Sequence, residues 1–204
     1  MQEEIVVRDH EGKPRIDAEH LLFPAASFKG ALAHRLNFHV CRFTNIWADD
    51  GPLDDKKRHE QVDALLGAVK GKNKGQVGAL FIDDAFLPLD KNRLKEIPHN
   101  SIDRFTGGVR NRVLYSELSI HGSDSPIEIT LTLDERRLTQ NHADLPILRR
   151  ALKATLDDLC QGRLTLGSRT TTGNGFFTGT LTGDLETWLN AEDAAIQTEQ
   201  EEAA

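Results

Sequence analysis

The most regular hydrophobic pattern in the chain predicts a helix over residues 145–161. Pro146 stands in its first turn and Gly162 just past its end, which are positions that these residue types favour. Leucines recur every three or four residues along one stripe, as expected for a helix that packs through a single face. The leucines of this stripe are Leu145, Leu148, Leu152, Leu156 and Leu159.

A second helix is predicted to begin near Ser27, whose hydroxyl would serve as the N-cap. Phe28, Leu32 and Leu36 then fall on one face of that helix. A shorter amphipathic helix is expected over residues 62–69.

Between the helices, short apolar or alternating runs predict strands. Helices interspersed with strand pairs in this order favour an α+β fold with a ferredoxin-like antiparallel sheet and inserted helices, the architecture of RNA-recognition domains. The predicted strands are residues 5–7, 77–82, a hairpin of 113–120 with 127–133, and a last strand at 176–182.

Length and composition indicate one domain over residues 1–183 followed by an acidic tail, residues 184–204. The tail holds seven acids and no Lys or Arg, so the other residues carry equal numbers of acids and bases. No apolar run approaches the roughly 18 residues that a membrane span needs. No secretory signal and only two cysteines are present, so a reducing, cytoplasmic location is expected.

Three segments of the neutral body contain no acid at all: residues 20–48, 104–116 and 159–183. If these segments meet in space, they would form a positive groove for phosphates despite the net charge of −7. Chance clustering of charges is the alternative. The main basic residues are Lys29, Arg35 and Arg42, then Arg104, Arg110 and Arg112, then Arg163 and Arg169.

Each segment has its own candidate chemistry. Ser27, Lys29 and Gly30 stand at a predicted helix start, where backbone N–H groups favour a phosphate, although a capped and tightly packed helix would look the same. Arg104, Arg110 and Arg112 surround Phe105 in a hairpin that can lay cations along a backbone and wedge beside a base. A solvated loop without function is the alternative there.

The third segment is a glycine-rich loop between the leucine-striped helix and the last predicted strand. Gly167, Gly173 and Gly175 permit left-handed backbone geometry, while Arg169 and hydroxyls such as that of Thr170 can contact phosphate oxygens. A flexible turn is the alternative.

Taken in chain order, these motifs resemble the RAMP superfamily of CRISPR-associated proteins. Residues 23–35 are similar to its Pro-x-x-Ser-x-Lys-Gly-x-x-Arg helix start, although Arg35 lies one residue later than a strict spacing would put it. Residues 65–68 and 79–86 are similar to a Leu-Phe-Gly segment and the strand ending in Asp-Ala. Residues 100–107 and 114–117 resemble the region of the protruding thumb hairpin, and residues 167–175 the glycine-rich loop.

The closest likeness is to backbone subunits of type III CRISPR effector complexes, which act in antiviral defence. The resemblance implies a subunit that holds guide RNA, inserts its thumb between guide and target RNA, and stacks on other CRISPR complex subunits. It also implies a first strand before the matching segments. We expect either that a neighbouring polypeptide supplies this strand or that the chain is one piece of a larger or split subunit.

The resemblance further implies a possible metal-dependent endoribonuclease, in which an acidic loop residue holds Mg²⁺ and cleaves target RNA. Glu3, Asp9 and Asp17 are the candidates in this chain. Two other interpretations stay open. One is a CRISPR RNA-processing endonuclease with a histidine base and no metal, and the other is a scaffold subunit that contacts only protein.

Overall fold

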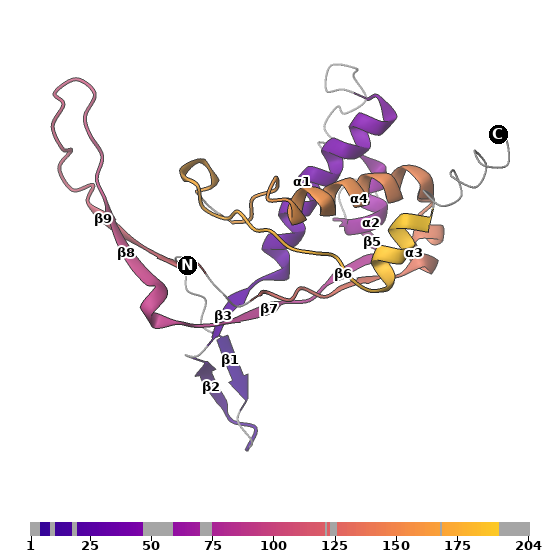
Figure 1. Ribbon diagram of the computed structural model, residues 1–204, viewed down its shortest axis with the longest axis horizontal. Helices are drawn as coiled ribbons and strands as arrows, with labels where there is room; N and C mark the ends of the chain where they lie inside the picture. Colours follow the sequence, from indigo (N-terminus) through magenta and orange to yellow (C-terminus); the bar gives the residue numbers. More distant parts are fainter. Residues whose placement is uncertain are drawn as a thin grey trace. The chain divides into compact units, whose positions relative to one another are not determined.

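The computed structural model describes residues 5–8, 11–17, 20–46, 59–69, 75–120, 122, 126–167 and 169–191, with only the backbone of 5–8 and 14–17. The chain divides into two compact units. Unit 1 comprises Met1–Phe23 and Ala85–Glu128, and unit 2 comprises Pro24–Asp84 and Ile129–Ala204. Helices and antiparallel strand pairs are both present, so the predicted α+β class is confirmed (Figure 1).

Unit 1 is built from three antiparallel pairs and a short 3-10 turn, η2 (Lys91–Arg93). The longest pair is a hairpin whose register runs from Leu94 opposite Ile120 to His99 opposite Tyr115. The pairs are β1 (Ile5–Arg8) with β2 (Pro14–Asp17), β3 (His20–Phe23) with β7 (Ala85–Pro88), and β8 (Leu94–His99) with β9 (Tyr115–Ile120).

Unit 2 is mainly helical. Its helices are α1 (Ala25–Thr44), α2 (Glu60–Leu66), α3 (Glu135–Gln140), α4 (Leu145–Cys160), the 3-10 turn η3 (Thr170–Thr172), and residues 184–191. Its strand pairs are β4 (Gly67–Ala68) with β5 (Gln76–Val77), and β6 (Leu80–Ile82) with β10 (Leu131–Leu133).

The core of unit 2 lies where α1 packs on α4 and α2. Arg35 meets Asp158, whereas Phe43 meets Arg150, so α1 and α4 run antiparallel. The three helices meet through large apolar side chains. Removing these side chains from water supplies most of the free energy that holds the helices together. The core includes Phe28, Leu32, Leu36 and Val40 of α1, Val62 and Leu65 of α2, Leu138 of α3, and Leu148, Leu152 and Leu156 of α4.

The leucine stripe predicted the fourth helix closely, since α4 begins at Leu145 and ends at Cys160. The strand at residues 5–7 is also confirmed as part of β1. The helix predicted to begin near Ser27 is α1, which begins two residues earlier, at Ala25, but the predicted N-cap was wrong, because Pro24 holds that position. Ser27 therefore lies inside the first turn, and its hydroxyl makes no cap. The predicted helix over 62–69 is α2, which ends earlier, at Leu66.

The predicted strand over residues 77–82 is broken in the structure. Gln76–Val77 form β5 and Leu80–Ile82 form β6, with residues 78–79 between them outside any strand. A Cβ on Gly78 would overlap the backbone of Leu66. The close approach of these two chain segments therefore interrupts the strand.

The predicted hairpin of residues 113–120 with 127–133 was wrong. β9 pairs with β8 through six residue pairs, and β10 pairs with β6 instead. The predicted strand at 176–182 was wrong too, because this segment forms only an isolated bridge from Thr178 to Gln161. The described strands form five two-stranded antiparallel sheets.

No helix within the described part of the chain combines the length and apolar character that crossing a lipid bilayer would require.

Candidate nucleic-acid interface

The hairpin of β8 and β9 ends in a tip, residues 100–114, that is folded by its own backbone bonds. The Asp103 carboxylate accepts hydrogen bonds from the N–H groups of Phe105 (2.8 Å) and Thr106 (3.0 Å). These two bonds lower the pKa of Asp103. Below them, Ile102 bridges to Val109. The tip is therefore a specified turn, and whether this exposed turn contacts RNA or is a solvated loop without function stays open.

The same tip presents a wholly exposed aromatic ring among exposed arginines. Phe105 is 100% exposed, and Arg104, Arg110 and Arg112 are exposed as well. No acidic partner of these arginines is found among the described residues. A cation beside an apolar ring is suited to contact phosphate and base together. All four side chains lie in unit 1, as the sequence grouped them.

The start of α1 differs from the predicted phosphate cradle in one respect. The first helical N–H, that of Ala25, donates to the Asp84 carboxylate at 2.7 Å. This acid comes from 59 residues away and occupies the place where an anion was expected. Of the predicted contacts, Ser27 and Gly30 are exposed and Lys29 is partly exposed.

Gly30 lies within a regular helix and faces open space among the described residues. A Cβ built on it would meet none of their atoms within 4 Å. Among the described residues, Gly30 therefore does not serve tight packing. A glycine within a helix costs about 1 kcal/mol relative to alanine.

The glycine-rich loop is closed at its base by a backbone hydrogen bond. Its outer part, which we call the crown and which includes Gly167 and Gly173, faces open space. At its base, Leu166 N–H donates to the Gly175 carbonyl at 2.9 Å. A Cβ on Gly175, where φ is +79°, would overlap the Leu166 carbonyl oxygen. Gly167 and Gly173 also have positive φ but face open space.

Arg169 enters the turn η3 in the left-handed region with φ of 59°. A non-glycine residue in that conformation is uncommon, so the loop holds the Arg169 backbone in a defined, costly geometry. Thr170 begins the turn and is partly exposed.

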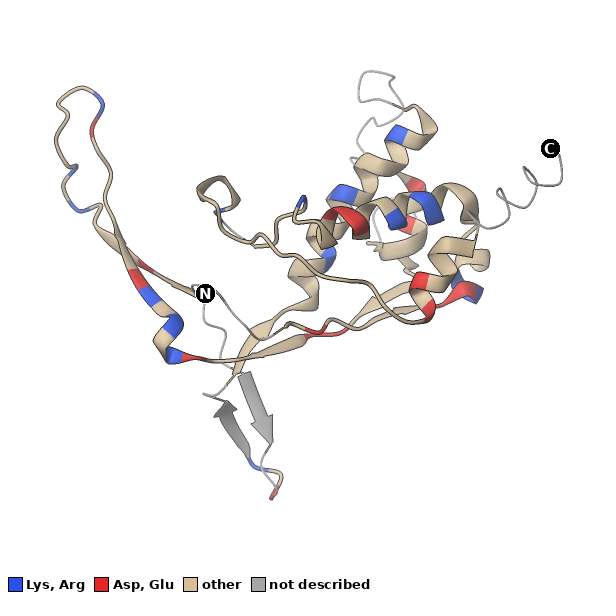
Figure 2. Ribbon diagram, in the orientation of Figure 1, with Lys and Arg blue, Asp and Glu red and all other residues tan. Residues whose placement is uncertain are grey.

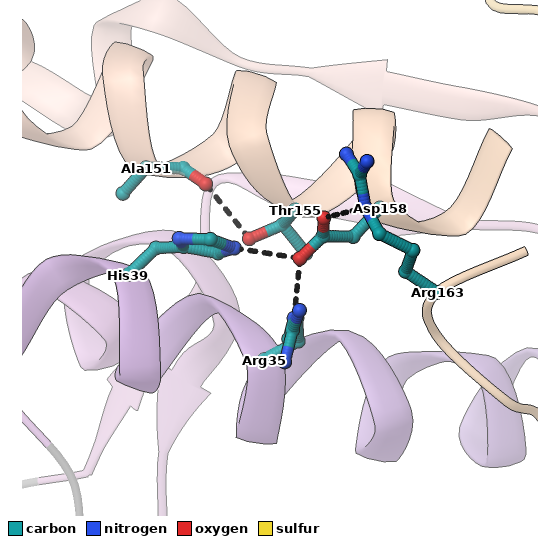
Figure 3. Close-up of polar contacts among 6 residues, drawn as sticks. All are labelled: Arg35, His39, Ala151, Thr155, Asp158 and Arg163. Atoms are coloured by element: carbon teal, nitrogen blue, oxygen red, sulfur yellow. Dashed lines mark hydrogen bonds and ion pairs between the residues drawn. The ribbon is translucent and has the colours of Figure 1, made fainter. Parts of the chain in front are cut away.

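A buried acid ties this part of unit 2 together (Figure 3). Asp158 is 5% exposed and accepts hydrogen bonds from Arg35, from His39 Nε2 at 2.9 Å and from Arg163 Nε at 2.7 Å. Arg35 and His39 belong to α1, whereas Arg163 lies in the segment that leads to the glycine-rich loop. Asp158 thus fixes the loop's first arm against α1.

Burial of the Asp158 carboxyl would by itself raise its pKa, but its three hydrogen-bond donors outweigh that effect. They lower the pKa from 3.8 to about 2. Since the folded pKa is depressed, the stability that this carboxylate contributes is present above pH 4 and lost as the pH falls through 2.

Sequence reasoning missed Asp158. A signal existed, because Ala151, Thr155 and Asp158 fall on one buried face of α4 and the facing helix contains no acid. The consequence for Arg35 is that its guanidinium, 30% exposed, is engaged by Asp158. Its predicted contact with RNA stays a prediction, and it would have to be made beside this ion pair.

The residues of the predicted basic groove are divided between the two units, and the groove itself stays a prediction. Lys29 of α1 and Arg169 of the glycine-rich loop belong to unit 2, and Arg110 belongs to unit 1. Figure 2 shows Lys and Arg on both the hairpin tip and the helices of unit 2.

The predicted catalytic acids lie where side chains are not described. Glu3 and Asp9 are outside the described residues, and Asp17 ends β2, of which the backbone alone is described. Within the described part of the chain, no group of three or more His, Cys, Asp or Glu is placed to hold a metal ion. Cleavage with Mg²⁺ stays a prediction.

Comparison with known proteins gives a family but no individual relative. A search of the curated proteins finds no match to the chain. The family model described as "RAMP superfamily" matches residues 4–178. This match spans the β8–β9 hairpin, the start of α1 and the glycine-rich loop, which are the three segments described above. The chain belongs to the RAMP superfamily.

Proposed function

We propose that this chain is a guide-RNA-binding backbone subunit of a type III CRISPR interference complex. RAMP membership supports a CRISPR-associated, RNA-binding role. The observation that carries the finer proposal is the β8–β9 hairpin, whose folded tip exposes Phe105 completely among three arginines that have no acidic partner within the described part of the chain. In this role the hairpin is the thumb that enters between guide and target RNA.

The hairpin's poor internal burial supports an external partner. An isolated two-stranded ribbon is marginally stable in water, and this one leaves large apolar side chains exposed along β9 and the tip. Contiguous exposed apolar surface usually marks an interaction site. These exposed side chains are Ile102, Phe105, Val109, Leu114, Tyr115, Leu118 and Ile120.

Guide binding by this subunit is expected to be independent of base sequence. Arginine guanidinium groups and loop N–H groups recognise phosphates, which carry no sequence information. Phe105 can stack on any base, since every base has a π face.

The ferredoxin-like sheet belongs to this proposal as well. β3 with β7, and β6 with β10, are two-stranded antiparallel pairs of the kind from which such a sheet is assembled. We expect a strand from a neighbouring polypeptide to extend these pairs within the complex, because an unpaired strand edge is a template for pairing.

Substitution of three predicted contacts tests the proposal. Lys29, Arg110 and Arg169 would each be changed to alanine in one variant, and binding of a fluorescein-labelled single-stranded RNA would be measured by anisotropy at several salt concentrations. We expect affinity to fall at least about tenfold, and the slope of log K against log salt to fall by about 2, at roughly 0.7 per lost contact with single-stranded RNA.

Arg136→Ala, an exposed cation of α3 outside the three segments, is the matched control and is expected to keep both affinity and slope. Unchanged binding in the triple variant would contradict the proposal. Cleavage of repeat RNA that resists EDTA would favour the processing endonuclease instead. Normal assembly of the complex without crosslinks to RNA would favour the scaffold.

A further inference from the structure

Two uncompensated arginines flank an aromatic ring where the C-terminal end of α1 meets the N-terminal half of α4. The guanidinium carbons of Arg42 and Arg150 lie 5.5 and 4.5 Å from the centroid of the Phe43 ring. Both arginines are exposed, and within the described residues neither has an ion pair. We call Arg42, Phe43 and Arg150 the arginine clamp.

The clamp contrasts with the other end of the same helix pair. There, Arg35 and Arg163 share the carboxylate of Asp158, so their charges are compensated inside the chain. Like charges held near one another raise the free energy unless an anion lies between them. The clamp therefore calls for an acidic partner that the described part of the chain does not provide.

The chain itself carries such a partner close by. Residues 184–191 are helical, with Leu189 buried and Trp188 4.3 Å below the guanidinium of Arg149, the neighbour of Arg150 on α4. Trp188 thus anchors this helix on α4, at the residue next to Arg150 in the sequence. The acidic segment, residues 192–204, starts four residues later and holds five acids and no Lys or Arg.

Reach and local concentration both favour this partner. Thirteen residues extend to roughly 45 Å at 3.3–3.6 Å each, whereas the whole of α4 is about 24 Å long at 1.5 Å per residue. A segment tethered so near its target has an effective concentration in the millimolar range. An acidic segment of another molecule would have to compete with that concentration.

We propose that the acidic segment docks on the arginine clamp. Carboxylates of the segment pair with Arg42 and Arg150, whose stacking on Phe43 holds both cations in place. The docking rests on charge and geometry alone. Its consequence rests on the proposed function: the segment shields these cations and weakens the attraction of unit 2 for RNA phosphates.

Zero-length crosslinking tests the docking. Arg42→Lys and Arg150→Lys keep the charge and place a primary amine at each position, which a carbodiimide then joins to a carboxylate in contact. Lys29 is the internal reference, since it lies on the same helix about 20 Å from Arg42. Mass spectrometry of the full-length variants would measure the crosslinks to Glu199, Glu201 and Glu202.

We expect the substituted positions to crosslink to the acidic segment at least about five times more than Lys29 does, with the preference lost in 0.5 M salt. Equal yields at all three lysines would mean that the segment does not dock, and would overturn the proposal.

A second measurement addresses the consequence for RNA. Converting the five acids of residues 192–204 to their amides should tighten binding of single-stranded RNA about 2- to 20-fold at low salt, as two exposed ion pairs imply. Arg42→Ala with Arg150→Ala should abolish that gain. An RNA affinity unchanged by the amides would overturn the shielding. If no variant bound RNA, the proposed function would fail, while the crosslinks would still decide the docking.

Discussion

The α1–α4 helix pair and the β8–β9 hairpin show two opposite uses of apolar side chains. In the helix pair, Leu36 and Leu152 are each 1% exposed, so these side chains pack inside the chain. At the hairpin tip, Phe105 is 100% exposed. Burial in the helix pair lowers the free energy of the folded chain, whereas the exposed ring at the hairpin tip contributes little to that free energy.

The charges divide in the same way. In the helix pair, Asp158 compensates Arg35 and Arg163 within a buried network. At the hairpin tip, the Asp103 carboxylate accepts hydrogen bonds from backbone N–H groups. Among the described residues, it does not form an ion pair with the nearby arginines. The helix pair of unit 2 thus compensates its buried charges internally, whereas the hairpin tip leaves arginine charges exposed.

The largest effect should come from deleting a core side chain. Leu152→Ala removes a buried side chain from the α1–α4 contact and should lower the free energy of unfolding by about 2–5 kcal/mol. Phe105→Ala, at the tip, should change it by less than about 0.5 kcal/mol. Urea denaturation of both variants would measure this. A comparable loss in Phe105→Ala would mean that the tip packs inside the chain and would break the comparison.

The next largest effect should come from the buried carboxylate. Asp158→Asn leaves its cationic partners without a counter-charge and should cost about 3 kcal/mol of unfolding free energy. Asp157→Asn is the matched control, because Asp157 is adjacent but exposed, and it should be close to neutral. Thermal or urea unfolding at pH 7 would compare them. Equal losses would show that Asp158 does not act through its network.

The same carboxylate gives a pH signature that serves as a second control. With its pKa lowered from 3.8 to about 2, the wild-type chain should lose about 2 kcal/mol from this group between pH 4 and pH 2. Asp158→Asn should not show that part of the loss. An identical pH dependence in both proteins would contradict the assigned pKa.

The sequence predicted the elements whose pattern is local. The leucine stripe located α4 to within a residue, because helix periodicity and burial depend on neighbours along the chain. The glycine-rich loop was recognisable for a similar reason, since Gly167, Gly173 and Gly175 do adopt positive φ. Family motifs in chain order added the superfamily, which the family model confirms.

Features set by distant residues were missed or wrong. The cap of α1 is completed by Asp84 from another part of the chain, so Ser27 was given a role that it does not have. The sequence pattern paired β9 with the segment that follows it, but β9 pairs with β8, which precedes it. β8 was not recognised as a strand because Lys95, Glu96 and Pro98 are residue types that strands disfavour. Strand pairing depends on which edges meet in the fold, and spacing in the sequence does not specify that.

The smallest effect distinguishes two glycines of one loop. Gly175 needs both its positive φ and its missing Cβ, so Gly175→Ala must displace the Leu166 carbonyl and should cost about 2 kcal/mol. Gly173 has a φ of +90° but open space around it, so Gly173→Ala should cost only about 1 kcal/mol. Stability would be measured by urea unfolding and RNA affinity by anisotropy.

If the crown of the loop contacts phosphates, Gly173→Ala should weaken RNA binding more than its small loss of stability explains, because its new methyl group points into the open space where the RNA would lie. Equal stability losses at the two positions would mean that the base of the loop is as open as its crown.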